Sequence, residues 1–175
     1  MSAKNLLAER LKAVERSARV RRYHTEPVIH QQNVGEHTYG VMWMILLMVD
    51  SPSANLLKAA LMHDTAEYAV GDVPSPTKKT PVIKQAFDQL EDEMLERLLW
   101  KLPDITDVEA RFLKLADLLE GAAFCLSEWR RGNRDISTAL GNYLRYIATM
   151  HPDGKAGEIF NFIKEQAHEY GFQGE

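Results

Sequence analysis

The stretch Ala60-Leu-Met-His63-Asp64-Thr-Ala-Glu67-Tyr-Ala-Val-Gly71-Asp72 places a histidine and several acids among mostly apolar residues. If this stretch is helical, His63 and Glu67 share a face because they are four residues apart, and Asp64 leans toward the same point. Burying an unpaired carboxylate costs several kcal/mol. We therefore expect Asp64 and Glu67 to be solvated, paired or bound to a cation.

Working outward from that stretch, apolar residues recur at helical spacing along most of the chain. The longest apolar run, Val41 to Val49, has nine residues, against the roughly 18–20 that span a bilayer, and indicates a buried helix covered on most sides. No alternating run supports a sheet. The expected fold is all-α, a helical bundle with helices at about Lys4–Arg16, Val34–Val49, Ala54–Val70, Pro81–Trp100, Asp107–Arg130, Ile136–Met150 and Lys155–Tyr170.

The composition limits the class of protein. A chain of 175 residues with 45% hydrophobic and 26% charged positions can build a core, and we expect one domain over residues 1–175. A net charge of −4 gives no general attraction to nucleic acid or to a membrane surface, so neither is expected as a partner. Cys125 is the only cysteine, which excludes an intrachain disulfide and indicates a reducing, cytoplasmic compartment.

Two more polar residues lie in apolar surroundings. Asp117 falls in the middle of the expected helix 107–130, and His37 lies near the start of the most apolar helix. For each residue alone, a hydrogen-bonded core position is the commoner arrangement. Two histidines and two aspartates from three helices would nevertheless suit a borderline divalent metal such as Mn²⁺, Co²⁺, Fe²⁺ or Zn²⁺.

Together these motifs resemble the HD-domain phosphohydrolases, whose signature is an upstream His, an adjacent His-Asp pair and a distant Asp. The more specific resemblance is to YfbR-type 5′-deoxynucleotidases and the related small phage dATP triphosphohydrolases. It covers about Arg22 to Gly121, the expected metal-binding core. The motifs that carry it, in matching order, are Arg22-Tyr23, Asn33-Val-Gly-Glu-His37-Thr, His63-Asp64-Thr-Ala-Glu67 and Gly71-Asp72-Val-Pro-Ser-Pro-Thr-Lys78.

The resemblance implies a role for each matching residue. Glu67 would lie near the reacting phosphorus as an acid or water-orienting group, and Asp72 would contact the sugar or help to hold the site. The resemblance also leaves room for a second metal near these two acids. Arg22 matches the phosphate-binding arginine, and Tyr23 occupies an aromatic position, often Trp in the family, that packs against deoxyribose or base. The implied ligands of a divalent metal (Co²⁺, Mn²⁺, Zn²⁺, Fe²⁺ or Mg²⁺) are His37, His63, Asp64 and Asp117.

The expected function is metal-dependent hydrolysis of a deoxynucleotide at the phosphate on its 5′ oxygen. The loop that contains Pro76, Lys78 and Lys79 could line the substrate and place charge beyond the first phosphate. That charge favours dATP, which would give deoxyadenosine and triphosphate. A 5′-deoxynucleotidase acting on monophosphates is the alternative, followed by a nucleotide-binding module without turnover, or a hydrolase of cyclic dinucleotides or guanosine alarmones.

The setting is expected to be the cytoplasm of a bacterium or of a phage-infected host. A homo-oligomer is also expected, because so apolar a helix in a small domain needs cover and because similar proteins assemble with copies of themselves.

Overall fold

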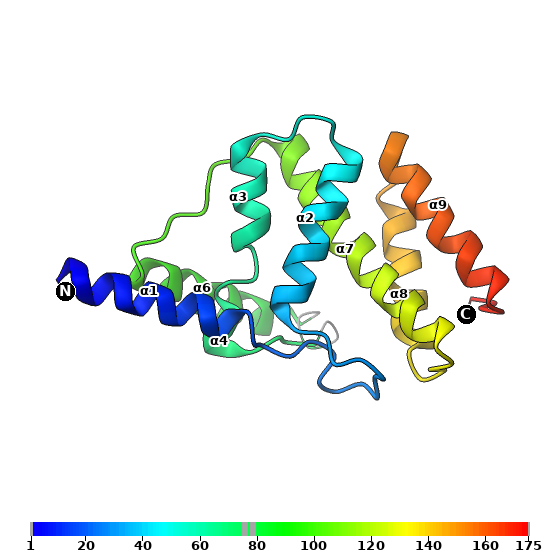
Figure 1. The fold of residues 1–175 in the computed structure, drawn as a ribbon, viewed down its shortest axis with the longest axis horizontal. Coiled ribbons are helices and arrows are strands. Elements are labelled where there is room, and N and C mark those ends of the chain that lie inside the picture. The colour runs from blue at the N-terminus through cyan, green and yellow to red at the C-terminus, as the bar shows by residue number, and fades with distance from the viewer. Residues whose placement is uncertain (1, 75–76, 78–79, 175) are drawn as a thin grey trace.

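The computed structural model describes residues 2–74, 77 and 80–174, and these residues form helices joined by turns and loops (Figure 1). Within them the extended pairing is limited to an isolated bridge between Arg21 and Asn33. The prediction of an all-α fold is confirmed. The helices are α1 (Ala3–Ser17), α2 (Val34–Met48), α3 (Ala54–Met62), α4 (Glu67–Val70), α6 (Pro81–Arg97), α7 (Asp107–Arg130), α8 (Ser137–Thr149) and α9 (Gly154–Glu169).

Helices α2 and α7 are the two central helices, and each starts with a capping box. The side chain of Asn33 accepts a hydrogen bond from the Glu36 backbone, and the Glu36 side chain accepts one from the Asn33 backbone. Thr106 and Glu109 make the same reciprocal pair at the start of α7. These boxes satisfy backbone donors that a helix start leaves without partners, and so they fix where both helices begin.

The core lies where α2 crosses α7, with α3 against one side of the pair and α8 and α9 against the other (Figure 1). Helices α1, α4 and α6 gather at the N-terminal end of the molecule, away from α9. The largest core side chains that are almost fully buried are Val41, Ile45, Leu56, Leu115, Leu119, Ile136, Leu140 and Ile147.

The predicted helix from Ala54 to Val70 is wrong in its second half, because the structure ends α3 at Met62 and resumes with the short α4 at Glu67. Between these two helices backbone N–H groups donate to the carbonyl three residues before them, in place of the four-residue spacing of an α-helix. Thr65 donates to Met62, and Glu67 donates to Asp64. The His63 ring also bonds the carbonyl of Ala60. The chain therefore turns at the His-Asp pair, which helical periodicity alone does not reveal.

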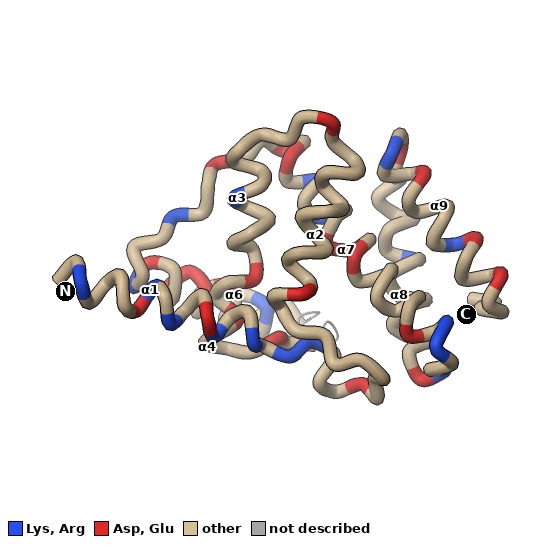
Figure 2. The backbone as a smooth tube through the Cα atoms, in the orientation of Figure 1, with Lys and Arg blue, Asp and Glu red and all other residues tan. Residues whose placement is uncertain are grey.

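Helix α2 is less covered than its sequence predicts. Figure 2 shows it nearly free of charge beyond its first turn, where Glu36 is its one charged residue. Even so, Tyr39, Trp43 and Leu47 expose 67%, 49% and 54% of their surface, so one side of the helix is open to solvent. Within the described part of the chain, no helix combines the length and apolarity needed to cross a membrane.

Candidate metal centre

Four side chains converge where α2, α7 and the turn after α3 meet. His37 Nε2 lies 3.3 Å from Asp117 Oδ1 and 3.5 Å from Asp64 Oδ2. His63 Nε2 lies 3.4 Å from His37 Nε2 and 3.4 Å from Asp64 Oδ2. The structure thus brings together all four residues that the sequence predicts as metal ligands.

These separations fit a metal ion. Zinc bound at about 2.0–2.2 Å by four tetrahedral donors holds neighbouring donor atoms roughly 3.3–3.6 Å apart. Four of the six distances between donors, 3.3 to 3.5 Å, fall in that range. The donor atoms of His37, His63 and Asp117 all lie within 4.8 Å of one another, and Asp64 approaches this group through the two histidines. Imidazole nitrogens and carboxylate oxygens are also the donors that Zn²⁺, Co²⁺, Mn²⁺ and Fe²⁺ accept. We conclude that the cluster has the donor chemistry of a divalent metal site, with His37, His63 and Asp117 spaced to share one ion and Asp64 beside them.

The ring orientations of both histidines are fixed from behind. His63 Nδ1 donates to the Ala60 carbonyl at 2.7 Å. His37 Nδ1 bonds the Glu120 carboxylate. With Nδ1 protonated in each ring, the Nε2 atoms are left to face the cluster, which is the tautomer a metal requires.

Charge is tightly balanced in the cluster. Burial lowers the pKa of His37, but hydrogen bonds to Asp117 and Glu120 outweigh it and raise that pKa to about 9. Burial raises the pKa of Asp117, but its bond with His37 and the nearby Lys114 ammonium hold that pKa far below its usual range. Lys114 Nζ lies 2.8 Å from Asp117 Oδ2. In the metal-free protein, the proton on His37 thus supplies part of the positive charge that a metal would bring.

Arg22 reaches the same cluster from the loop before α2. Its guanidinium NH1 donates to Asp64 Oδ2 at 3.1 Å, and the residue is only 8% exposed. Burial lowers the pKa of Arg22, but the Asp64 carboxylate raises it well above its usual value, so the group stays charged. The buried Nε atom has no hydrogen-bond partner among the described residues. A guanidinium with a spare donor beside a metal site is suited to an anionic ligand.

Tyr23 follows Arg22 with a positive φ of 54°, an uncommon conformation for a residue with a side chain. Its ring stacks on Phe124 with centroids 4.7 Å apart, and its hydroxyl donates to the Tyr143 hydroxyl at 3.0 Å. Tyr143 lies across Gly121, where a Cβ atom would clash with the tyrosine ring. Tyr23 is therefore held between α7 and α8, beside the Arg22 guanidinium.

The remaining predicted residues are placed less fully. Glu67 is buried, 4% exposed, at the first position of α4. Asp72 is half-buried after α4 and, among the described residues, makes no hydrogen bond or ion pair with the cluster. The expectations for Pro76, Lys78 and Lys79 lie outside the described residues.

Sequence reasoning missed four residues that touch the site, namely Gln32, Lys114, Glu120 and Tyr143. The signal for Glu120 is present in the sequence, because it is a second acid three residues after Asp117 in an apolar helix. Lys114 lies three residues before Asp117, on the same face of the helix. Gln32 and Tyr143 come from a loop and a distant helix, and their spacing in the sequence carries no such signal.

The sequence matches the family described as 5′-deoxynucleotidase YfbR-like over residues 7–170. A 5′-deoxynucleotidase from Photorhabdus temperata is 28% identical over 166 residues, which covers 81% of each chain.

Two solved structures share the fold. An HD-domain phosphohydrolase from Listeria innocua superposes with a TM-score of 0.70 at 18% identity, covering 95% of this chain and 92% of that one. An HD phosphohydrolase from cyanophage S-2L, bound to dA and one catalytic Zn²⁺, gives a TM-score of 0.61 at 18% identity, covering 90% and 96%.

Proposed function

The chain belongs to the YfbR-like 5′-deoxynucleotidase family, and on that premise we propose that it hydrolyses deoxynucleoside 5′-monophosphates to deoxynucleosides and phosphate. At the coarser level it is an HD-type, metal-dependent phosphohydrolase of deoxynucleotides. The observation that supports the finer statement best is the Arg22 guanidinium bonded to Asp64 of the four-donor cluster. On this proposal, that contact holds the phosphate-binding guanidinium beside the metal ligands.

The proposal gives each described residue a task. His37, His63, Asp64 and Asp117 would hold one divalent cation, which would supply an activated water near neutral pH and neutralise charge on a phosphoryl oxygen. Arg22 binds a second phosphate oxygen and so orients the phosphorus toward the cluster. Glu67 gives or takes the proton that hydrolysis moves, and Asp72 contacts the sugar. Tyr23 presents its ring to the deoxyribose or base. Glu67 and Asp72 are the two acids that we propose for a second cation.

Hydrolysis of dATP to deoxyadenosine and triphosphate is the second candidate. The sequence favours it through Lys78 and Lys79, which lie outside the described residues. The preference for dATP is not confirmed, because the family and the Photorhabdus relative are named for 5′-deoxynucleotidase activity. The cyanophage structure, at 18% identity, shows the shared fold alone.

The test is product analysis with metal-stripped protein. Purified protein is incubated with dAMP, AMP or dATP after addition of Co²⁺, Mn²⁺, Zn²⁺ or Mg²⁺, and the products are separated by ion-exchange chromatography. The proposal expects phosphate and deoxyadenosine from dAMP, and a much slower reaction with AMP. Triphosphate from dATP, with dAMP left intact, would replace the proposal by the second candidate.

A contaminating phosphatase is excluded by a matched variant. Asp117→Asn keeps the size of the side chain and removes one metal-binding carboxylate, so the measured activity must fall with it. Activity that is equal in the variant would belong to another protein.

We further propose that the chain is one domain that assembles with copies of itself in the cytoplasm, with neither nucleic acid nor membrane as a partner. The exposed apolar side of α2, with Tyr39, Trp43 and Leu47, supports the assembly, because apolar surface of this kind favours contact with another protein. Light scattering coupled to gel filtration tests it. We expect a multiple of the 19.9 kDa chain mass that decreases in Trp43→Glu, whereas a wild-type monomer would refute it.

A further inference from the structure

Glu120 is a buried acid that contacts the back of the His37 ring and has no part in the proposed hydrolysis. It lies about one turn beyond Asp117 on α7 and is 8% exposed. One carboxylate oxygen accepts from His37 Nδ1, and the other accepts from Gln32 Nε2 at 2.7 Å. A carboxylate buried in this way is costly unless it is hydrogen-bonded, and here each oxygen has a partner.

The approach of Glu120 to His37 depends on a glycine. Gly40 lies one turn after His37 on α2, and a Cβ atom at this position would come within 2.6 Å of Glu120 Cγ. That distance is shorter than real side chains tolerate. The absence of a side chain at Gly40 therefore lets the Glu120 stem cross α2 and reach the back of the His37 ring.

The second partner of Glu120 leads to the substrate side of the cluster. Gln32 is 4% exposed, and its backbone carbonyl accepts a 2.9 Å hydrogen bond from the Arg22 backbone. The Arg22 side chain in turn donates to Asp64. The Glu120 carboxylate thus connects His37 with Gln32, and the Gln32 backbone is paired with the backbone of Arg22.

We propose that Glu120 is a positioning residue with two tasks: it orients His37 for the metal and, through Gln32, holds Arg22 toward the phosphate. A carboxylate that accepts from the far nitrogen of a metal-bound histidine fixes its tautomer and makes the near nitrogen a better donor. The first task requires only the metal site. The second rests on the function proposed above, because it assigns a phosphate to Arg22.

The first task is tested by titrating Co²⁺ into metal-free protein and following its visible absorption, with calorimetry as a second readout. We expect Glu120→Ala to weaken metal binding about 10- to 100-fold. Glu120→Gln should recover part of the affinity, because an amide oxygen can still accept from His37 Nδ1. Gly40→Ala should reproduce the loss, because its Cβ displaces Glu120.

Glu128→Gln is the matched control, because Glu128 is also a buried acid on α7 but has no contact with the four donors. It should leave the metal affinity unchanged. Folded Glu120→Ala and Glu120→Gln proteins that both bind Co²⁺ as tightly as the wild type would overturn the first task. Circular dichroism confirms that each variant is folded.

The second task is tested with Gln32→Leu, which leaves the bond between Glu120 and His37 in place. We expect its KM for dAMP to rise about 3- to 10-fold while kcat and the Co²⁺ affinity change little. An unchanged KM would overturn this task. If no nucleotide is hydrolysed at all, the function proposed above fails, whereas the Co²⁺ titration still decides the role of Glu120.

Discussion

Glu120 and Glu128 lie about two turns apart on α7, and both are buried, but they bind different kinds of partner. Glu120 accepts from the ring of His37 and from the side chain of Gln32. Glu128 accepts from the backbone of Ile29 at 2.6 Å and of His30 at 3.0 Å, away from the donor cluster. The comparison indicates that α7 supplies two carboxylates with different tasks. One supports the candidate metal site, and the other fixes the shape of a loop.

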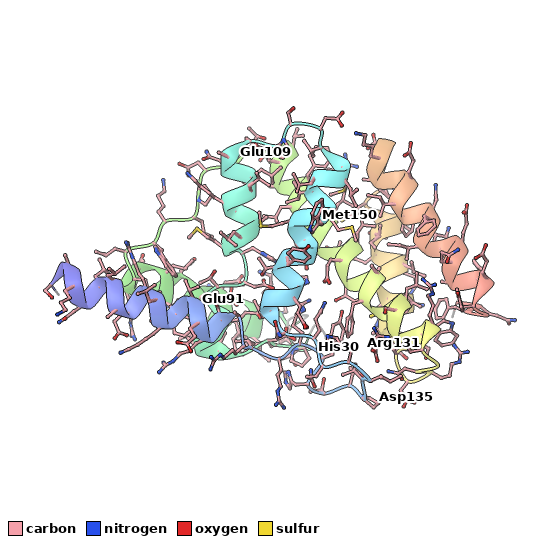
Figure 3. The ribbon with its side chains drawn as sticks, in the orientation of Figure 1. His30, Glu91, Glu109, Arg131, Asp135 and Met150 are labelled. Carbon is pink, nitrogen blue, oxygen red and sulfur yellow. The ribbon has the colours of Figure 1, made fainter. Side chains whose placement is uncertain are left out.

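The two carboxylates hold neighbouring parts of the same loop, residues 21–33: Glu120 bonds Gln32, and Glu128 bonds Ile29 and His30. At the Glu128 end, Asn133 donates both to Glu128 at 2.9 Å and to the Pro27 carbonyl at 2.8 Å. Figure 3 shows His30 and Arg131 at this end of α7. Removing the Glu120 carboxylate should therefore change the affinity for metal, and removing the Glu128 carboxylate should change the free energy of unfolding.

The largest effect is expected at the metal end of α7, in Asp117→Asn. The variant loses a charged metal donor, so kcat/KM should fall by more than the ~10- to 100-fold loss that a supporting residue causes. Initial rates with dAMP and calorimetry with Zn²⁺ measure both losses. A variant with wild-type metal affinity would remove Asp117 from the ligand set and break the comparison.

The next effect is expected at Arg22, which the loop presents to the cluster. A charge-assisted hydrogen bond is worth about 1.5–3 kcal/mol, so Arg22→Ala should lower kcat/KM for dAMP roughly 10- to 100-fold, mostly through KM. Arg22→Lys should recover only part, because lysine lacks the two-pronged guanidinium. An equal KM in all three proteins would show that the phosphate lies elsewhere.

The metal end of α7 should also respond to pH, because metal binding must remove the extra proton from His37. Its pKa in the metal-free protein is about 9, so metal affinity should rise with pH up to that value, by at most about tenfold per unit. Zn²⁺ titrations at several pH values below 8 test this. A flat profile would show that His37 is already neutral.

The same pKa predicts the stability of the metal-free protein. Because the folded pKa of His37 lies above its ordinary value of 6.5, its contribution is complete below pH 6.5 and is lost as pH rises through about 9. Urea unfolding of metal-free protein across this range should show the decline. Saturation with Zn²⁺ should abolish it.

A smaller effect is expected at the other carboxylate. Glu128→Gln should lower the free energy of unfolding by about 1–3 kcal/mol, because the charged acceptor of two backbone N–H groups is lost. Burial raises the pKa of Glu128, but bonds from Asn133, Ile29 and His30 outweigh it and lower that pKa below 4.5. Wild-type stability from this group is therefore present above pH 4.5 and lost as pH falls through the folded pKa.

Urea unfolding at pH 7 and at lower pH measures this difference. The gap between wild type and Glu128→Gln should close as the pH falls. A gap that persists with full size in acid would show that the loss comes from packing and not from the carboxylate charge.

The smallest effect is expected between the two carboxylates, at Cys125. Its thiol is fully buried, and burial raises its pKa to about 12, so it cannot serve as a thiolate near neutral pH. Cys125→Ala should leave kcat/KM for dAMP unchanged and cost about 1 kcal/mol of stability. A large loss of activity in a folded variant would mean that this middle part of α7 takes part in the chemistry.

Much of the fold can be predicted from apolar spacing and caps. Helix α7 has the expected bounds, Asp107–Arg130, because a threonine cap and a long apolar face specify it locally. The break after Met62 could not be predicted in the same way. At this break the His63 ring donates to the Ala60 carbonyl, and the turn is held by i to i+3 backbone hydrogen bonds. Neither feature changes the spacing of apolar residues in the sequence.

The residues of the candidate site also fall into a group that the sequence predicts and a group that it does not. His37, His63, Asp64 and Asp117 could be predicted because each is a polar residue in apolar surroundings and because the set resembles a known signature. Gln32, Gly40 and Tyr143 could not, since their importance arises from tertiary contacts between a loop and three helices. Sequence reasoning thus finds the polar residues that converge in the cluster more readily than the residues that hold them in place.

The most direct test of the account is a crystal structure of the protein grown with Zn²⁺, with anomalous diffraction recorded on both sides of the zinc absorption edge. The account predicts one strong peak about 2.0–2.2 Å from His37, His63, Asp64 and Asp117. A peak bound by other residues, or none at these four donors under saturating Zn²⁺, would contradict it.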